Sequence, residues 1–181
     1  MVRATDEARY LGMSTRLTTS IKTVADHSAD IIAAIEELKR NQVLVGVPAA
    51  KAPRTHQQAK GQTINNAALL YIHDNGMPSK NIPARPVVHP GIKDAQAQIE
   101  KNLASAANAA FDGKRSQMMA ALGRAGFSAT TSIKLRIQSN TPPPLARSTI
   151  LARRRRGHTS TKTLVEFGEM RNAVNWVIRR K

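Results

Sequence analysis

The sequence predicts an α+β protein, in which a small mixed or antiparallel sheet packs against two long helices, with an extra N-terminal helix and long loops. Three observations predict this class. Apolar residues recur at helical spacing over residues 91–111 and 114–137, and short apolar or alternating runs lie outside them at 42–48 and 174–178. Aromatic residues make up only 3% of the chain. A core of Ala, Leu, Ile, Val and Met favours packed helices over an aromatic-rich sandwich.

The length of 181 residues suits one domain with a real core. Residues 1–16 are polar and unpatterned and are interpreted as an N-terminal arm, and residues 17–181 as a single α+β domain. The chain has no cysteine, which removes disulfides and thiolate metal sites and fits a reducing compartment. No signal-peptide core and no run of about 18 apolar residues occurs. We therefore expect a soluble protein made in a cytoplasm, without a membrane partner.

The first expected elements are a helix over residues 18–40 and a short buried strand over 42–48. The apolar residues of the helix follow steps of three and four, with small Ser28 at the one missing step, which predicts one buried face: Ile21, Val24, Ile31, Ile35 and Leu38. Lys39 and Arg40 suit its last turn. Pro48 stops the strand. The polar segment 49–62 is then predicted to be a long loop, of a kind that is functional or orders on assembly.

A short helix and a long helix are expected next. Thr63 is predicted to cap the short helix, and Asn75 and Gly76 are predicted to end it. Its expected apolar face is Ile64, Ala67, Ala68, Tyr71 and Ile72. Pro90 and Gly91 are predicted to open the long helix. Its expected face is Ile92, Ala95, Ile99, Leu103, Ala106, Ala110 and Phe111.

A second long helix is predicted from Lys114. Its apolar residues keep helical phase: Met118, Leu122, Ala125, Ala129, Ile133 and Ile137. A strand remains the rival for its last part, where apolar and basic residues alternate. Gly123 and Gly126 are expected to weaken the helix.

The end of the chain is predicted to be a loop followed by a strand. Three consecutive prolines, at 142–144, predict a loop through the basic segment 140–161, in which 148–151 can form one turn. The alternation of Val174, Trp176 and Ile178 with more polar residues predicts a terminal strand that is half buried against the helices.

The net charge of +16 is unevenly distributed, because no acidic residue occurs between Asp112 and Glu166. A positive electrostatic field this large points to a polyanion or an acidic protein as a neighbour. The alternative is a solvated face that keeps the protein soluble. Four adjacent arginines are the densest part of this stretch: Arg153, Arg154, Arg155 and Arg156. On a mobile loop they can contact DNA phosphates or acidic side chains without sequence preference. The alternative is a solvated loop.

Catalytic and metal-binding patterns are missing from the sequence. No two histidines have metal-ligand spacing, and the acidic residues are scattered. No phosphate-binding loop and no nucleophile elbow occurs. His73 and Asp74 form a titratable pair, but a histidine at a helix end more often complements the helix dipole. We therefore expect no enzymatic activity, no catalytic residue, no metal and no cofactor.

Four segments occur in an order that resembles a known family: VLVGVP, NNAALLYIHDNGMPSKNIPARPVVHPGI, PPPLARSTILARR and LVEFGEMRNAVNWVI. This order is similar to that of the tail-completion and head–tail joining (neck) proteins of tailed bacteriophages, also known as minor tail or virion morphogenesis proteins. The resemblance covers about residues 40–180. Its most specific part is the proline loop: Ile82, Pro83, Ala84, Arg85 and Pro86.

The resemblance implies two long helices against a small sheet and no catalysis. It also implies a homo-oligomeric ring, commonly of six copies, between the portal and adaptor proteins and the tail tube or tail terminator. The location implied is the virion neck, after synthesis in the host bacterial cytoplasm. The basic stretch is then expected to face packaged DNA or an acidic neighbouring ring. Two alternatives stay open: a sequence-nonspecific DNA- or RNA-binding protein, and a tail-terminator ring.

A ring subunit meets its neighbours through preformed surfaces, which suggests a role for the proline loop. Its prolines lower the freedom of the loop before assembly, so that less entropy is lost on docking. Arg85 is expected to be aimed at a carboxylate or a carbonyl edge. The predicted subunit or partner interface is therefore Ile82, Pro83, Arg85 and Pro86. The alternative is a structural loop that only starts the long helix.

Overall fold

The computed structural model describes residues 26–54 and 64–181 and has the predicted α+β class. In the described residues the α-helices are α1 (Ser28–Arg40), α2 (Asn66–Asn75), α3 (Val88–Asp94), α4 (Gln96–Phe111), α5 (Arg115–Gln138), α6 (Arg147–Arg155) and α7 (Glu169–Ala173). The strands are β1 (Asn41–Gly46) and β2 (Asn175–Arg180), and short 3-10 turns occur at Ala49–Lys51 and Pro78–Lys80. The predicted arm at 1–16, the start of the first helix and the cap at Thr63 lie outside the described residues.

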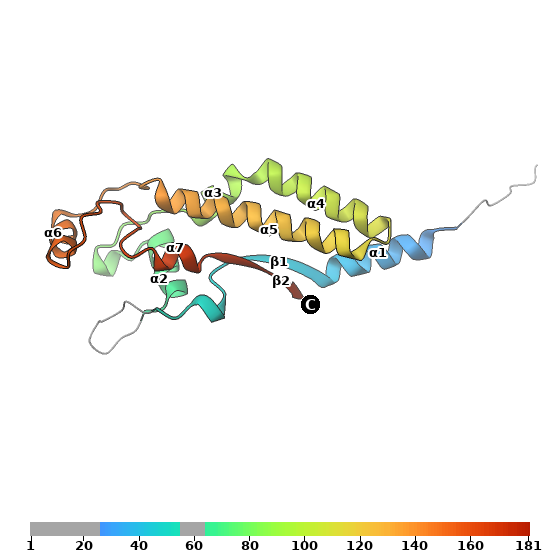
Figure 1. The fold of residues 1–181 in the computed structure, drawn as a ribbon, viewed down its shortest axis with the longest axis horizontal. Helices are drawn as coiled ribbons and strands as arrows, with labels where there is room; N and C mark the ends of the chain where they lie inside the picture. Colours follow the sequence, from blue (N-terminus) through green and yellow to red (C-terminus); the bar gives the residue numbers. More distant parts are fainter. Residues whose placement is uncertain (1–25, 55–63) are drawn as a thin grey trace, which may run out of the picture.

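Helix α5 is the longest element and lies between α4 on one side and the sheet on the other (Figure 1). The predicted helix over this segment is confirmed, and the rival strand is wrong. The six residues of the predicted face are all buried: Met118, Leu122, Ala125, Ala129, Ile133 and Ile137. The four largest belong to two hydrophobic clusters: Met118 and Leu122 pack near α4 and α1, whereas Ile133 and Ile137 pack near α2 and α7.

Helix α4 buries small residues against α5, so the predicted apolar face is wrong at three of its seven positions. Ala106 and Ala110 are buried as expected, together with Asn102 and Ala109. The larger predicted residues are exposed: Ile92, Leu103 and Phe111. Small side chains allow the two helix backbones to approach closely, and this close packing decides which face is buried.

The single helix predicted from Pro90 is two helices, because the chain breaks at Ala95 between α3 and α4. Helix α3 already begins at Val88. The carboxylate of Asp74 explains this start, since it accepts hydrogen bonds from the N–H groups of Val87 (2.7 Å) and Val88 (3.0 Å). An acidic side chain from α2 thus accepts hydrogen bonds from free N–H groups at the N-terminus of α3.

The sheet is antiparallel, and its register pairs Asn41 with Arg180 at one end and Gly46 with Asn175 at the other. Residues facing α5 join the hydrophobic clusters, among them Val43, Val45 and Ile178. Both predicted strands are present, and β2 is half buried as expected, but β1 is only partly buried and not the buried strand that was predicted. Trp176 lies over Gly123 and Gly126, where a Cβ atom would meet the indole at 3.1 and 2.9 Å. The two glycines expected to weaken α5 therefore admit the tryptophan of β2.

Helices α1 and α2 end where predicted, but they begin later than predicted, at Ser28 and Asn66, and do not bury the predicted faces. Only Ala34 is buried in the described part of α1, and Ile31 and Ile35 are exposed. In α2, Asn65 is the N-cap and accepts a hydrogen bond from the Ala68 N–H, and the helix ends before Gly76 as expected. Its buried residues are Asn66 and Leu70, whereas Tyr71 is 70% exposed. None of the helices in 26–54 and 64–181 has the length and apolar character of a membrane span.

Replacing Gly126 by alanine tests the contact between α5 and β2. The added Cβ atom overlaps the Trp176 side chain, so the free energy of unfolding is expected to fall by about 1 kcal/mol or more despite the gain in helix propensity. Urea unfolding followed by circular dichroism measures this change. Thr131→Ala on the exposed side of α5 is the control and should cause no loss. Equal or greater stability of Gly126→Ala would contradict the packing described.

Candidate functional site

The tetra-arginine block lies at the end of α6, so the predicted loop through this segment is wrong. Arg153 is 6% exposed, and its guanidinium donates hydrogen bonds to main-chain carbonyl oxygens of the following segment. The acceptors are Ser160 (3.3 Å), Lys162 (2.6 Å), Thr163 (3.3 Å) and Val165 (3.4 Å). The prediction of four exposed arginines is therefore wrong for Arg153 and confirmed for Arg154, Arg155 and Arg156.

A second buried arginine comes from the proline loop. Arg85 is 4% exposed, and it donates from Nε to the carbonyl oxygen of Pro143 (2.8 Å) and from Nη2 to that of Pro144 (3.2 Å). Its own N–H donates to the carbonyl oxygen of His73 (2.7 Å). Arg85 does bind carbonyl oxygens, as expected, but they belong to its own chain. The expectation that Arg85 lies on an exposed interface is therefore wrong. Pro83 and Pro86 are exposed, and Ile82 is partly buried.

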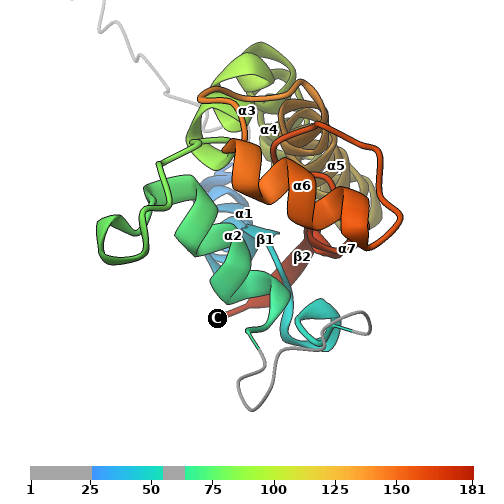
Figure 2. The same cartoon turned by 90° about the vertical axis from the view of Figure 1, so that its left-hand side faces the viewer.

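The two predicted sets of site residues meet in one cleft of about 790 Å³. Ile82, Pro83 and Arg85 line it from one side, and Arg153 and Arg156 from the other. Pro86, Arg154 and Arg155 are not part of its lining. Figure 2 views the molecule from the end at which this cleft lies, with α6 in front and α2 beside it. Residues about 70 positions apart in the sequence thus share one site.

The cleft has more positive than negative side chains. Its lining includes four arginines (Arg54, Arg85, Arg153 and Arg156) and two carboxylates (Glu166 and Glu169). Glu166 binds Arg156 at 2.6 Å and Arg153 at 3.6 Å, and Glu169 lies 3.6 Å from Arg54. Among the described residues, the ion pairs do not include Arg85. Burial lowers the pKa of the Arg85 and Arg153 guanidiniums, which remain positive at neutral pH.

His73 also lines the cleft, in the last turn of α2. Burial lowers the pKa of its imidazole below the ordinary value of 6.5, and neighbouring positive charges lower it further: Arg85, Arg153 and Arg54. Its Nδ1 atom is buried without a hydrogen-bond partner among the described residues. His73 is therefore neutral at pH 7 and is not the charged, dipole-complementing residue that we expected.

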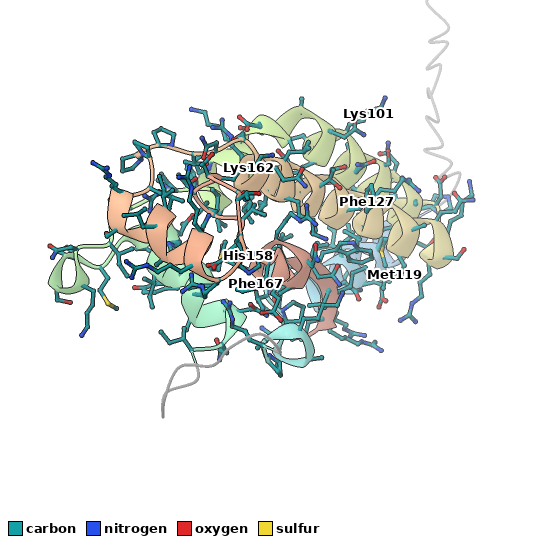
Figure 3. All side chains as sticks on the ribbon, turned by 60° about the vertical axis from the view of Figure 1, so that its left-hand side comes forward. Lys101, Met119, Phe127, His158, Lys162 and Phe167 are labelled. Carbon is teal, nitrogen blue, oxygen red and sulfur yellow. The ribbon has the colours of Figure 1, made fainter. Side chains whose placement is uncertain are left out.

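Phe167 lines the cleft, and the ring of His158 packs against it. Their rings are 4.5 Å apart in an edge-to-face arrangement, and both are labelled in Figure 3. The N–H of His158 donates to the carbonyl oxygen of Arg153 (3.0 Å), which links the ring pair to the end of α6. This contact holds the segment that carries Glu166 against the arginines.

The chemistry of the cleft is that of an anion-binding surface. Guanidiniums donate several hydrogen bonds in a plane and match carboxylate or phosphate oxygens. The described residues contain no group of three or more His, Asp or Glu side chains that could hold a metal ion. Sequence reasoning missed Arg54 and Glu169, but Glu166 had a signal, since it is the first acidic residue after Asp112 and lies ten positions beyond Arg156.

Comparison with known proteins gives no relative: no family model, no curated protein and no solved structure matches this chain.

Replacing Arg153 by glutamine tests its structural role. We expect the free energy of unfolding to fall by about 3–5 kcal/mol, because several carbonyls and Glu166 lose a charged donor. Arg154→Gln removes the same charge from the next, exposed position and should change stability by no more than about 0.5 kcal/mol. Urea unfolding of both variants measures the difference. Equal effects of the two substitutions would contradict the burial of Arg153.

The lowered pKa of His73 predicts a pH dependence of stability. Below pH 6.5 the unfolded chain binds a proton that the folded chain binds more weakly, so the free energy of unfolding should decrease as the pH falls through this range. Unfolding of the wild type and of His73→Gln at pH 7.5 and 5.5 measures this effect, with the other histidines present in both. The variant should lose less stability. An equal loss in both proteins would show that His73 does not contribute.

Proposed function

We propose that this protein is a structural virion protein that forms a ring at the phage neck and joins the portal and adaptor proteins of the DNA-filled head to the tail. The resemblance of its four ordered segments to tail-completion and neck proteins suggests this role. Under this proposal the chain binds neighbours and catalyses no reaction. A tail-terminator ring is the nearest alternative within the same class.

The observation that carries the proposal is the exposure of all three phenylalanines of the chain. Phe111 is 51% exposed, Phe127 64% and Phe167 38%. Alanine is the most frequent apolar residue in the core, so the chain fills much of its core with small residues and leaves its phenylalanines exposed. Large apolar side chains on the surface mark sites that a partner covers. Phe127 and Phe167 lie on different parts of the surface in Figure 3, which suits a subunit with more than one neighbour.

The sheet offers a further surface for assembly. It has two strands in the described residues, and each pairs only with the other, so each strand has one unpaired edge. Leu44 and Val177 are register partners and are 39% and 41% exposed, on the face away from α5. A two-stranded sheet with an exposed apolar pair on its outer face is suited to extension or coverage by another chain.

Binding of DNA or RNA without sequence preference is the second candidate, and the net charge of +16 favours it. Titration with a 30-base-pair duplex at 50 and 200 mM salt distinguishes the two functions. Tight binding that weakens by about 10³-fold or more over this range indicates a nucleic-acid-binding protein. Weak binding at both salt concentrations is expected for a ring subunit.

Ring formation is tested directly by native mass spectrometry and negative-stain electron microscopy, on the chain alone and with a purified portal–adaptor complex. We expect a closed ring, of six copies, in at least one of the two samples. Phe127→Asp should abolish it while leaving circular dichroism unchanged, because a carboxylate replaces an exposed phenylalanine on α5. Gln117→Asp, at an exposed position of the same helix, should assemble normally. A chain that stays a monomer in both samples would refute the proposal.

A further inference from the structure

Arg85 has a buried charge that no described carboxylate neutralises. The residue is 4% exposed, and the acceptors that it binds are the neutral carbonyl oxygens of Pro143 and Pro144. Two hydrogen bonds to carbonyls satisfy part of a guanidinium, which has five N–H donors. An unpaired buried charge is costly, and an anion in the adjoining cleft would lower this cost.

The other arginines of the cleft show which anion the site accepts. Glu166 lies between Arg153 and Arg156, and Glu169 lies against Arg54, so protein carboxylates already occupy these three guanidiniums. Arg156 is the most accessible of them, since 54% of its side chain is exposed. Burial lowers the pKa of His73, and the positive charges of Arg85, Arg153 and Arg54 lower it further. Arg85 and Arg156 are therefore the positions at which a further carboxylate is best placed.

Much of the rest of the lining is apolar, which favours a polypeptide over a nucleic acid. Prolines and aliphatic side chains make up much of the wall, including Ile82, Pro83, Pro143, Pro144, Leu145 and Met170. The volume of about 790 Å³ falls within the range of about 300–1,000 Å³ of sites that hold a drug-sized ligand. A single anion does not fill this space. A duplex would meet exposed Arg154 and Arg155, which lie outside the cleft.

We propose that the cleft binds a short acidic segment of a partner polypeptide, with one carboxylate paired with Arg85, a second at Arg156 and apolar side chains against the prolines. The carboxylate at Arg156 competes with Glu166, which acts as an internal substitute for the partner. The inference rests on the proposed assembly function, for which it defines the chemistry of the neighbour.

The first test selects ligands from an mRNA-displayed library of random twelve-residue peptides on the immobilised full chain. We expect enrichment of sequences that combine Asp or Glu with apolar residues. The same selection on Arg156→Gln should lose this enrichment, and the selection on Arg154→Gln should keep it. Both arginines lie at the end of α6, but only Arg156 lines the cleft. Failure to enrich acidic sequences, or equal enrichment on both variants, would overturn the inference.

The second test measures the affinity of the most enriched peptide by fluorescence anisotropy at 150 mM salt. Loss of one charge-assisted pair at Arg156→Gln should weaken binding about tenfold. Arg154→Gln should weaken it less than twofold, and Glu166→Gln should strengthen it, because the competing carboxylate is gone. Circular dichroism checks that the variants fold. Unchanged or weaker binding by Glu166→Gln would contradict the proposed competition.

Two controls identify the source of the anion. Inorganic phosphate at 10 mM and a twelve-nucleotide single-stranded DNA compete with the labelled peptide in separate arms. If the DNA displaces the peptide, and if Arg154→Gln and Arg156→Gln weaken this displacement equally, nonspecific electrostatic attraction accounts for the binding. That result would rule out the peptide site. Ring assembly is measured on the same preparations. If the chain forms rings but selects no acidic peptide, only the proposed peptide binding by the cleft is refuted. If the chain selects acidic peptides but does not assemble, the proposed ring is refuted.

Discussion

The burial of two guanidiniums, Arg85 and Arg153, is the constraint on which the cleft end of the molecule depends. Residues 140–146 and 160–165 contain no helix or strand, so their carbonyl oxygens need donors from elsewhere. Arg85 supplies them to Pro143 and Pro144, and Arg153 supplies them to four carbonyls of the later segment. A chain with few aromatic residues and few carboxylates thus uses arginine as a structural centre.

This arrangement links the fold to the proposed function. Helix α5 is the support along which α4 and the sheet pack (Figure 1). Its C-terminal half joins the hydrophobic cluster beneath the cleft. The cleft is therefore attached to a rigid element, and its arginines are ordered before any partner binds, which lowers the entropy lost on docking. Large apolar residues remain exposed on other surfaces, including Phe111 and Phe127. These exposed apolar surfaces are consistent with the proposed assembly.

The sequence predicted the elements with strong periodicity and missed those that depend on particular contacts. The face of α5 and the alternation of β2 were predicted because a sustained period leaves one arrangement for the core. The face of α4 was not, since close packing against α5 selected Asn102 and Ala109 over Leu103. Helix α6 was missed because the three prolines at 142–144 predicted a loop through the whole segment, although the helix begins beyond them at Arg147. The burial of Arg153 was missed because a run of four arginines suggested solvent. Both halves of the candidate site were identified from the sequence, but their proximity in the fold was not. No local sequence pattern indicates that Arg85 reaches the segment of Pro143.

The most direct test of the account is the hydrogen exchange of arginine side chains, measured by nuclear magnetic resonance on the chain labelled with ¹⁵N-arginine. Signals are assigned by single Arg→Lys substitutions. The guanidinium N–H protons of Arg85 and Arg153 should exchange slowly with solvent, and those of Arg154 and Arg155 rapidly. Exchange of all four arginines at the same fast rate would contradict the buried guanidiniums and the cleft that they form.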